Sequence, residues 1–257
     1  MSFTHKNFAR ILTKYNYDIK EGDIIAGTIF SKEKKGYLVD IGNPTVAFLP
    51  LEEVSFSFSK IKNIETNLTQ EFFIFAYSIH TKTIIVSIKR LVYIRSWERI
   101  KQLYKENTII YTRIIGQNKG GLLIELENIQ GFIPKSHLCY MINRNNVTNL
   151  DIPCKFLIAN EQSNQLVLSN RAAILEYYIS NLKIGTIFNS TIIAIKPYGI
   201  FVNIYNIPAL LHISEAAIPN INDLTNQFFL GQTINVKIIH VDTKQGRLSV
   251  SRRNIKA

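Results

Sequence analysis

Short alternations of apolar and polar residues recur three times along the chain, and each begins at a glycine. They are Gly36-Tyr-Leu-Val-Asp-Ile41, Gly121-Leu-Leu-Ile-Glu-Leu126 and Gly199-Ile-Phe-Val-Asn-Ile204. Because successive side chains of a β-strand point to opposite faces, a period of two predicts half-buried strands. Turn-forming residues bound these runs, which are too short for core helices. The pattern therefore predicts three copies of one small β-structure.

Two further markers follow each of these strands in the same order. An apolar step comes first: Ala47-Phe-Leu-Pro50, Gly131-Phe-Ile-Pro134 and Ala209-Leu-Leu-His212. An apolar run then closes on Ser87, Ser169 or Ser251, and these serines are 82 residues apart both times (169 − 87 and 251 − 169). A copy of about 70 residues built from such strands suits a small closed barrel. We therefore expect an all-β fold of tandem barrels.

The hydrophobic period becomes helical outside the barrels, which predicts short helices joining them. We assign a linker helix to 91–105 and another to 172–182, with barrels at 19–90, 106–171 and 183–253. An amphipathic segment over 1–18 precedes the first barrel, and it either packs on its own domain or docks on a partner. The apolar residues at helical spacing in these three segments are Trp97, Ile100, Leu103 and Tyr104; Ala173, Leu175, Tyr178 and Leu182; and Phe8, Ile11, Leu12 and Tyr15.

Charge adds a candidate partner to this picture. The formal net charge is +11 and the pI is near 9.6, which fits either a nucleic-acid-binding protein or an ordinary basic surface. Residues 183–257 carry +5 (8 Lys and Arg minus 3 Asp and Glu), whereas residues 106–172 carry only +1 (6 minus 5). The third repeat is therefore the better candidate for binding phosphates.

Several classes of protein are disfavoured. Cys139 and Cys154 lie 15 residues apart without a CxxC pair, so we expect free thiols in a reducing compartment and no zinc site. No apolar run approaches the roughly 18 residues of a membrane span, and no secretion signal is evident. HExxH, P-loop and Ser/His/Asp patterns are missing too. We expect no enzymatic activity, cofactor, metal, membrane or small-molecule substrate.

The third repeat carries an aromatic side chain on the wrong face for a core residue. Ile200, Val202 and Ile204 would face the interior, which leaves Phe201 on the outside. Tyr198 can share this surface across the Gly199 kink. Exposed rings beside cations suit single-stranded RNA, because each stacked base contributes about 1–3 kcal/mol. The neighbouring cations are Lys196, Arg247 and Arg252.

These residues resemble the S1-type oligonucleotide-binding domain (OB-fold), and nearly the whole chain is similar to the ribosomal S1 family of the small subunit. The likeness rests on Asp18-Ile-Lys-Glu-Gly-Asp-Ile-Ile-Ala-Gly-Thr28, on Lys119-Gly-Gly-Leu122 with Gly131-Phe-Ile-Pro-Lys-Ser136, and on Asn164-Gln-Leu-Val-Leu-Ser-Asn-Arg-Ala-Ala173. It implies five-stranded barrels. Residues 7–17 and the excess of Ile, Asn and Lys look like the cyanobacterial and plastid branch. That branch implies the plastid stroma, with a bacterial cytoplasm as the alternative.

The resemblance also assigns residues that face RNA: Tyr198, Phe201, His212, Asp242 and Arg247. Asp242 has an alternative role as a turn residue before Lys244-Gln-Gly246. His212 is alternatively an ordinary surface or core histidine. Both alternatives stay open on the sequence.

The first two repeats depart from this pattern. Leu38 and Leu123 replace Phe201, Lys35 and Gly120 replace Tyr198, Pro50 and Pro134 replace His212, and Thr83 and Gln165 replace Arg247. The resemblance implies that such repeats dock on proteins of the small ribosomal subunit. The basic residues Lys34, Lys35, Lys60 and Lys62 either contact ribosomal RNA or form a solvated face.

The sequence therefore predicts a constituent of the small ribosomal subunit that binds single-stranded mRNA and supports translation initiation. An alternative is an RNA chaperone, or an accessory factor of transcription or processing, that acts away from ribosomes. OB-type barrels serve many functions, so fold alone does not separate these two classes.

Overall fold

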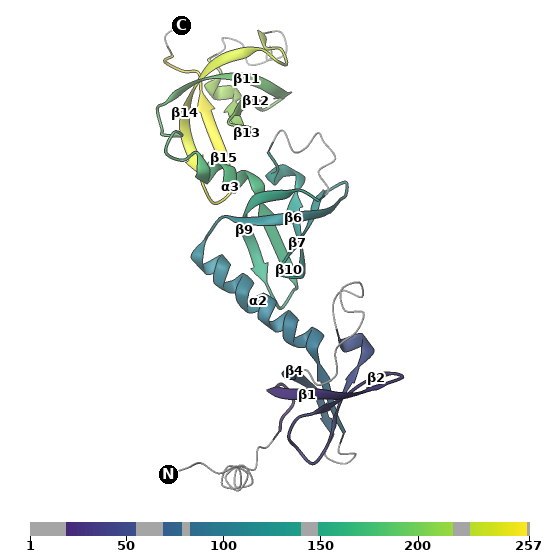
Figure 1. The fold of residues 1–257 in the computed structure, drawn as a ribbon. Coiled ribbons are helices and arrows are strands. Elements are labelled where there is room, and N and C mark those ends of the chain that lie inside the picture. The colour runs from purple at the N-terminus through teal and green to yellow at the C-terminus, as the bar shows by residue number, and fades with distance from the viewer. Residues whose placement is uncertain (1–18, 55–68, 79–82, 140–148, 218–226, 256–257) are drawn as a thin grey trace, which may run out of the picture. The chain divides into compact units, whose positions relative to one another are not determined.

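The computed structural model describes residues 19–54, 69–78, 83–139, 149–217 and 227–255 (Figure 1). The amphipathic segment expected over residues 1–18 lies outside the described residues. The chain forms two compact units, residues 1–96 and residues 97–257. The first unit holds one barrel, and the second holds the other two.

The first barrel closes in the strand order β1-β2-β3-β5-β4, with β3 and β5 parallel. A short 3-10 turn, η1 (Leu51–Glu53), follows its third strand. The strands are β1 (Ile24–Glu33), β2 (Gly36–Asp40), β3 (Ala47–Pro50), β4 (Thr69–Ser78) and β5 (Thr83–Ser87).

The second and third barrels repeat this topology, including the parallel pairing of the third and fifth strands and the 3-10 turn after the third. The second comprises β6 (Ile110–Gln117), β7 (Gly121–Leu126), β8 (Ile129–Pro134), η2 (Lys135–His137), β9 (Asp151–Asn160) and β10 (Gln165–Ser169). The third comprises β11 (Ile187–Lys196), β12 (Gly199–Ile204), β13 (Ile207–His212), η4 (Ile213–Glu215), β14 (Thr233–Asp242) and β15 (Arg247–Ser251). The predicted fold class, all-β with tandem five-stranded barrels joined by short helices, is confirmed.

The glycine that begins the second strand of each barrel is required by close packing. A Cβ atom at Gly36, Gly121 or Gly199 would collide with a main-chain carbonyl oxygen on the neighbouring third strand. Those oxygens belong to Leu49, Ile133 and Leu211, respectively. The sequence marker is therefore a strand-to-strand contact that no larger residue permits.

The α-helices among the described residues are α2 (Ile88–Glu106) and α3 (Asn170–Tyr177). Within the second unit, Tyr104 of α2 makes an edge contact with Phe156 of β9, the ring centroids being 5.9 Å apart. Ser169 caps α3 by accepting a hydrogen bond from the backbone N–H of Ala172 at 3.0 Å. This cap explains why α3 begins two residues before the start expected from the apolar stripe.

Helix α3 contributes to the core of the third barrel. Leu175 of α3 and Leu182, which follows the helix, are 0% and 2% exposed and belong to the same buried cluster as Val202 and Ile238. Tyr178 packs against this cluster, and its ring stacks on that of Tyr205 with a centroid distance of 4.3 Å. The third barrel is therefore completed by residues that precede its first strand.

Candidate nucleic-acid interface

The outer face of β12, β13 and β15 carries Phe201. Ile200 and Val202 are fully buried on either side of it, so its side chain points away from the barrel interior. Strand register places Phe201 opposite Leu210, and Leu210 beside Ser249 (the strands are labelled in Figure 1). This row of partly exposed side chains forms the centre of the face.

Tyr198 completes an aromatic pair with Phe201. The ring centroids lie 6.2 Å apart, the rings are nearly perpendicular, and Tyr198 is 52% exposed. The turn that carries Tyr198 is held where the Ile213 N–H donates to the Tyr198 carbonyl oxygen at 3.1 Å. Residues 198–204 thus have the arrangement that their alternation predicts, with two neighbouring rings presented to solvent. Such rings offer surfaces on which bases can stack.

His212 and Asp242 both take part in local turns. The backbone N–H of Ser214 donates to His212 Nδ1 at 3.3 Å, which caps the turn η4. Asp242 Oδ1 accepts from the Gln245 N–H at 3.0 Å. The turn role left open for Asp242 is therefore present. It leaves the other carboxylate oxygen of Asp242 for a further partner.

The three predicted cations have different surroundings. Lys196 is exposed at the end of β11, opposite Gly199. Arg247 is exposed and lies opposite Asp242 in the β14–β15 ladder. The guanidinium of Arg252 instead lies over the ring of Phe228, 5.2 Å from its centroid. Of these three side chains, Lys196 and Arg247 are exposed, whereas Arg252 is engaged in packing.

An aromatic side chain of the first two barrels was missed by the sequence analysis. Strand register places Phe48 opposite Leu38 and Phe132 opposite Leu123. In the third barrel this pair is reversed, since Phe201 on the second strand faces Leu210 on the third. Each phenylalanine lies between two buried residues in the apolar steps Ala47-Phe-Leu-Pro50 and Gly131-Phe-Ile-Pro134. This alternation was the signal that would have found the two outward rings.

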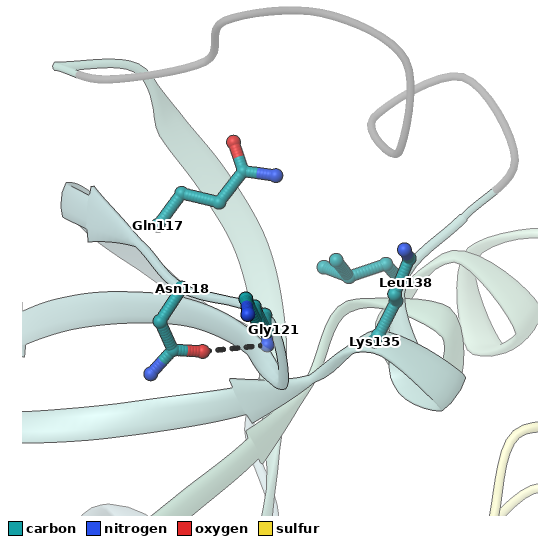
Figure 2. Close-up of a pocket in the computed structure, with 6 residues that line it drawn as sticks. Gln117, Asn118, Gly121, Lys135 and Leu138 are labelled. Carbon is teal, nitrogen blue, oxygen red and sulfur yellow. Dashed lines mark hydrogen bonds between the residues drawn. The ribbon is translucent and has the colours of Figure 1, made fainter.

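The second barrel has a polar recess at its β6–β7 turn, where the third barrel carries Tyr198. Figure 2 shows the residues that line it, with the Gly121 N–H donating to Asn118 Oδ1 at 2.9 Å. Its lining residues are Gln117, Asn118, Lys119, Gly121, Lys135 and Leu138. This surface offers two amines and two amides but no ring, so it differs chemically from its counterpart.

The cysteines are buried thiols. Burial raises the pKa of both Cys139 and Cys154 to about 12. Both are free in the structure. Across the described ranges, no group of three His, Cys, Asp or Glu side chains is placed to hold a metal ion. No described helix is long and apolar enough to cross a membrane.

Residues 18–89 and 181–253 match the family described as the S1 RNA binding domain. Together with the barrels, this match defines a protein built from repeated S1-type modules. The "Small ribosomal subunit protein bS1c" of Porphyra purpurea and that of Pyropia yezoensis are 46% and 47% identical to the chain. The alignments cover 99% of this chain and 98% and 97% of those proteins. Protein bS1A of Synechocystis is 36% identical over 99% of this chain and 78% of its own. The chain belongs to the bS1 family of small ribosomal subunit proteins.

Proposed function

We propose that this chain is a constituent of the small ribosomal subunit that binds single-stranded mRNA and supports translation initiation. The observation that carries the proposal is the pair of neighbouring rings on the outer face of the third barrel, with Tyr198 exposed and Phe201 partly exposed. The membership of the chain in the bS1 family supports the assignment to the ribosome. No catalytic step is required, because the proposed activity is binding.

Stacking supplies most of the affinity in this proposal. A ring face accepts any base, and two rings together contribute about 2–6 kcal/mol. Lys196 and Arg247 neutralise phosphates beside the rings. His212 and the free oxygen of Asp242 supply hydrogen bonds to a base or a 2′-hydroxyl. A face of this kind binds many sequences, as a factor that handles different messages must.

The first and second barrels, residues 19–90 and 106–171, attach the chain to proteins of the small subunit in this proposal. They lack the ring pair, and the second carries little net charge. Attachment raises the effective concentration of the third barrel at the ribosome, so weak binding of mRNA suffices. Contact of Lys34 and Lys35 with ribosomal RNA is an additional route of attachment.

We assign the protein to the plastid stroma. The two relatives at 46% and 47% identity both carry the name bS1c, which supports a plastid-type protein. The bacterial cytoplasm is the alternative compartment, since Synechocystis also has related proteins.

The aromatic pair is tested in the full chain by the double substitution Tyr198→Ala and Phe201→Ala. Losing about 2 kcal/mol or more of stacking should weaken binding to an oligoribonucleotide at least about 30-fold. Tyr111→Ala removes a more exposed ring, 71% exposed on β6, and should leave the affinity unchanged. Equal affinities of the double variant and the unmodified chain in a salt titration would refute the assignment.

Sucrose-gradient sedimentation tests the ribosomal part separately. We expect the full chain and residues 1–172 to migrate with the small subunit. Migration of the full chain away from ribosomes would favour the alternative, an RNA chaperone or accessory factor that acts off the ribosome.

A further inference from the structure

Each barrel ends on a buried serine that contacts a side chain of the 3-10 turn after the third strand. In the first barrel, Ser87 donates to a carboxylate oxygen of Glu53 at 2.6 Å. In the third barrel, Ser251 donates to Glu215 at 2.5 Å. The same contact thus closes two of the barrels around an anionic side chain.

The second barrel has a histidine where the other two have glutamate. Ser169 Oγ lies 3.1 Å from Nδ1 of His137, the third residue of η2, as Glu53 and Glu215 are of η1 and η4. The substitution removes a negative charge from this position of the second barrel alone.

The loss of that carboxylate changes the surroundings of an arginine. In the third barrel, Arg253 lies two residues after the closing serine, and its Nε is 3.7 Å from Glu215 Oε1. Its counterpart in the second barrel is Arg171. Nη2 of Arg171 donates to the carbonyl oxygen of Gln245 at 3.4 Å, whereas its buried Nε has no acceptor among the described residues. Arg171 is therefore a partly buried cation that lacks the neutralising partner of Arg253.

A second guanidinium group reaches the same place from the third barrel. The turn between β14 and β15 lies against the start of α3, because a Cβ atom at Gly246 would fall 2.7 Å from the backbone nitrogen of Ala172. Arg247 follows directly. Burial, Arg171 and Arg247 together lower the pKa of His137, and burial followed by Arg247 lowers the pKa of Arg171. The three side chains are thus close to one another, and the two guanidinium groups favour the neutral form of His137.

The anionic groups nearby do not offset this crowding. Asp242 lies opposite Arg247, but Oδ1 is used by the Gln245 N–H, and within the described part of the chain no ion pair joins Asp242 to Arg247. The thiol of Cys139, which lies near Arg171, is neutral because burial raises its pKa to about 12. Guanidinium groups gathered without carboxylates beside them are a usual form of a phosphate-binding site.

We propose that His137, Arg171 and Arg247, the seam cluster, bind a phosphate of the RNA backbone, so that a strand held by the third barrel continues onto the second. This inference rests on the proposed function, since it extends the same RNA path. Guanidinium groups bind phosphate oxygens through paired hydrogen bonds, and the unpartnered Nε of Arg171 is a donor suited to this contact. The second barrel would then touch RNA through a phosphate, without aromatic stacking.

The test compares two oligoribonucleotides of about 5 and about 14 nucleotides, since one OB barrel covers roughly 4–16 nucleotides. Full-length chains with Arg171→Gln or His137→Glu are titrated with each oligonucleotide at several salt concentrations. His137→Glu restores the carboxylate found in the other barrels. Arg113→Gln is the matched control, because Arg113 is an exposed arginine of the second barrel that pairs with Asp151.

Both seam variants should bind the longer oligonucleotide about five- to tenfold more weakly and reduce the salt slope by about 1. Binding of the shorter oligonucleotide and of the control variant should not change. Equal salt slopes for Arg171→Gln and Arg113→Gln with the longer strand would overturn the proposal. Loss of inorganic phosphate binding in Arg171→Gln, with an unchanged RNA salt slope, would also overturn it by assigning the cluster to free phosphate.

The outcome is separable from that of the aromatic pair. If the Tyr198/Phe201 variant binds RNA normally while Arg171→Gln lowers the salt slope, the stacking assignment fails and the seam cluster stands. If the Tyr198/Phe201 variant loses RNA binding while Arg171→Gln leaves the salt slope unchanged, the third barrel binds RNA without the second.

Discussion

Replacing Leu175 by alanine should destabilise the third barrel although the residue lies outside it in sequence. Leu175 is fully buried in the hydrophobic cluster of that barrel. Comparable leucine-to-alanine changes cost about 2–5 kcal/mol, through lost apolar burial and the cavity that forms. That is a large part of the roughly 5–15 kcal/mol that stabilises a domain.

Native-state hydrogen exchange of the full chain measures this effect barrel by barrel. Protection of the core amides of Val202 and Ile238 should fall about 30-fold or more in Leu175→Ala. Amides of the first barrel serve as an internal reference. Ile179→Ala, at a position that is 42% exposed just beyond α3, should leave protection nearly unchanged.

A uniform loss of protection in all three barrels, or no loss in the third, would contradict the assignment of α3 to the core of the third barrel. The same packing bears on fragment design. A fragment that begins at residue 183 lacks Leu175 and Leu182, whereas one that begins at 170 keeps both.

Two further predictions concern the second barrel. Gly121→Ala should lower the melting temperature, because its Cβ collides with the Ile133 carbonyl oxygen, at a cost of about 1–3 kcal/mol. Gly116→Ala should not lower the melting temperature, because its Cβ would lie at an ordinary 3.6 Å from Leu123. Equal melting temperatures of the two variants would argue against the collision. Cys139 and Cys154, with pKa values raised by burial to about 12, should react with a thiol reagent at pH 8 more than 100-fold more slowly in the folded chain than in denaturant. Because the folded thiols stay neutral, their contribution to the free energy of folding is fully present below the ordinary thiol pKa of about 8.5 and declines progressively above it. Fast labelling of the native chain would contradict the raised pKa values.

The architecture was predictable because each barrel repeats local signals. The glycine that starts the second strand, the alternation after it and the closing serine all reflect contacts within one barrel. The ring pair Tyr198–Phe201 was predictable for the same reason, since alternation fixes the face of Phe201 and a short turn fixes the place of Tyr198. The roles of these rings in binding RNA stay predictions.

Features that depend on pairing between strands were harder to foresee. Phe48 and Phe132 lie on the outer face because they occupy outward positions in the alternation of the third strand. The second strands, which carry Leu38 and Leu123, give no sign of them. The seam cluster depends on contacts across the chain, from η2 to β10 and α3 and on to the β14–β15 turn. Sequence separation hides such a cluster until the backbone brings its members together.

Closure of each five-stranded sheet has a consequence for a chain made of similar repeats. Consecutive copies lie at high local concentration, and open sheets of like sequence could pair edge to edge or exchange strands during synthesis. A closed barrel offers no long unpaired edge to its neighbour. The fold thus lets related modules accumulate in tandem while each one pairs only with itself.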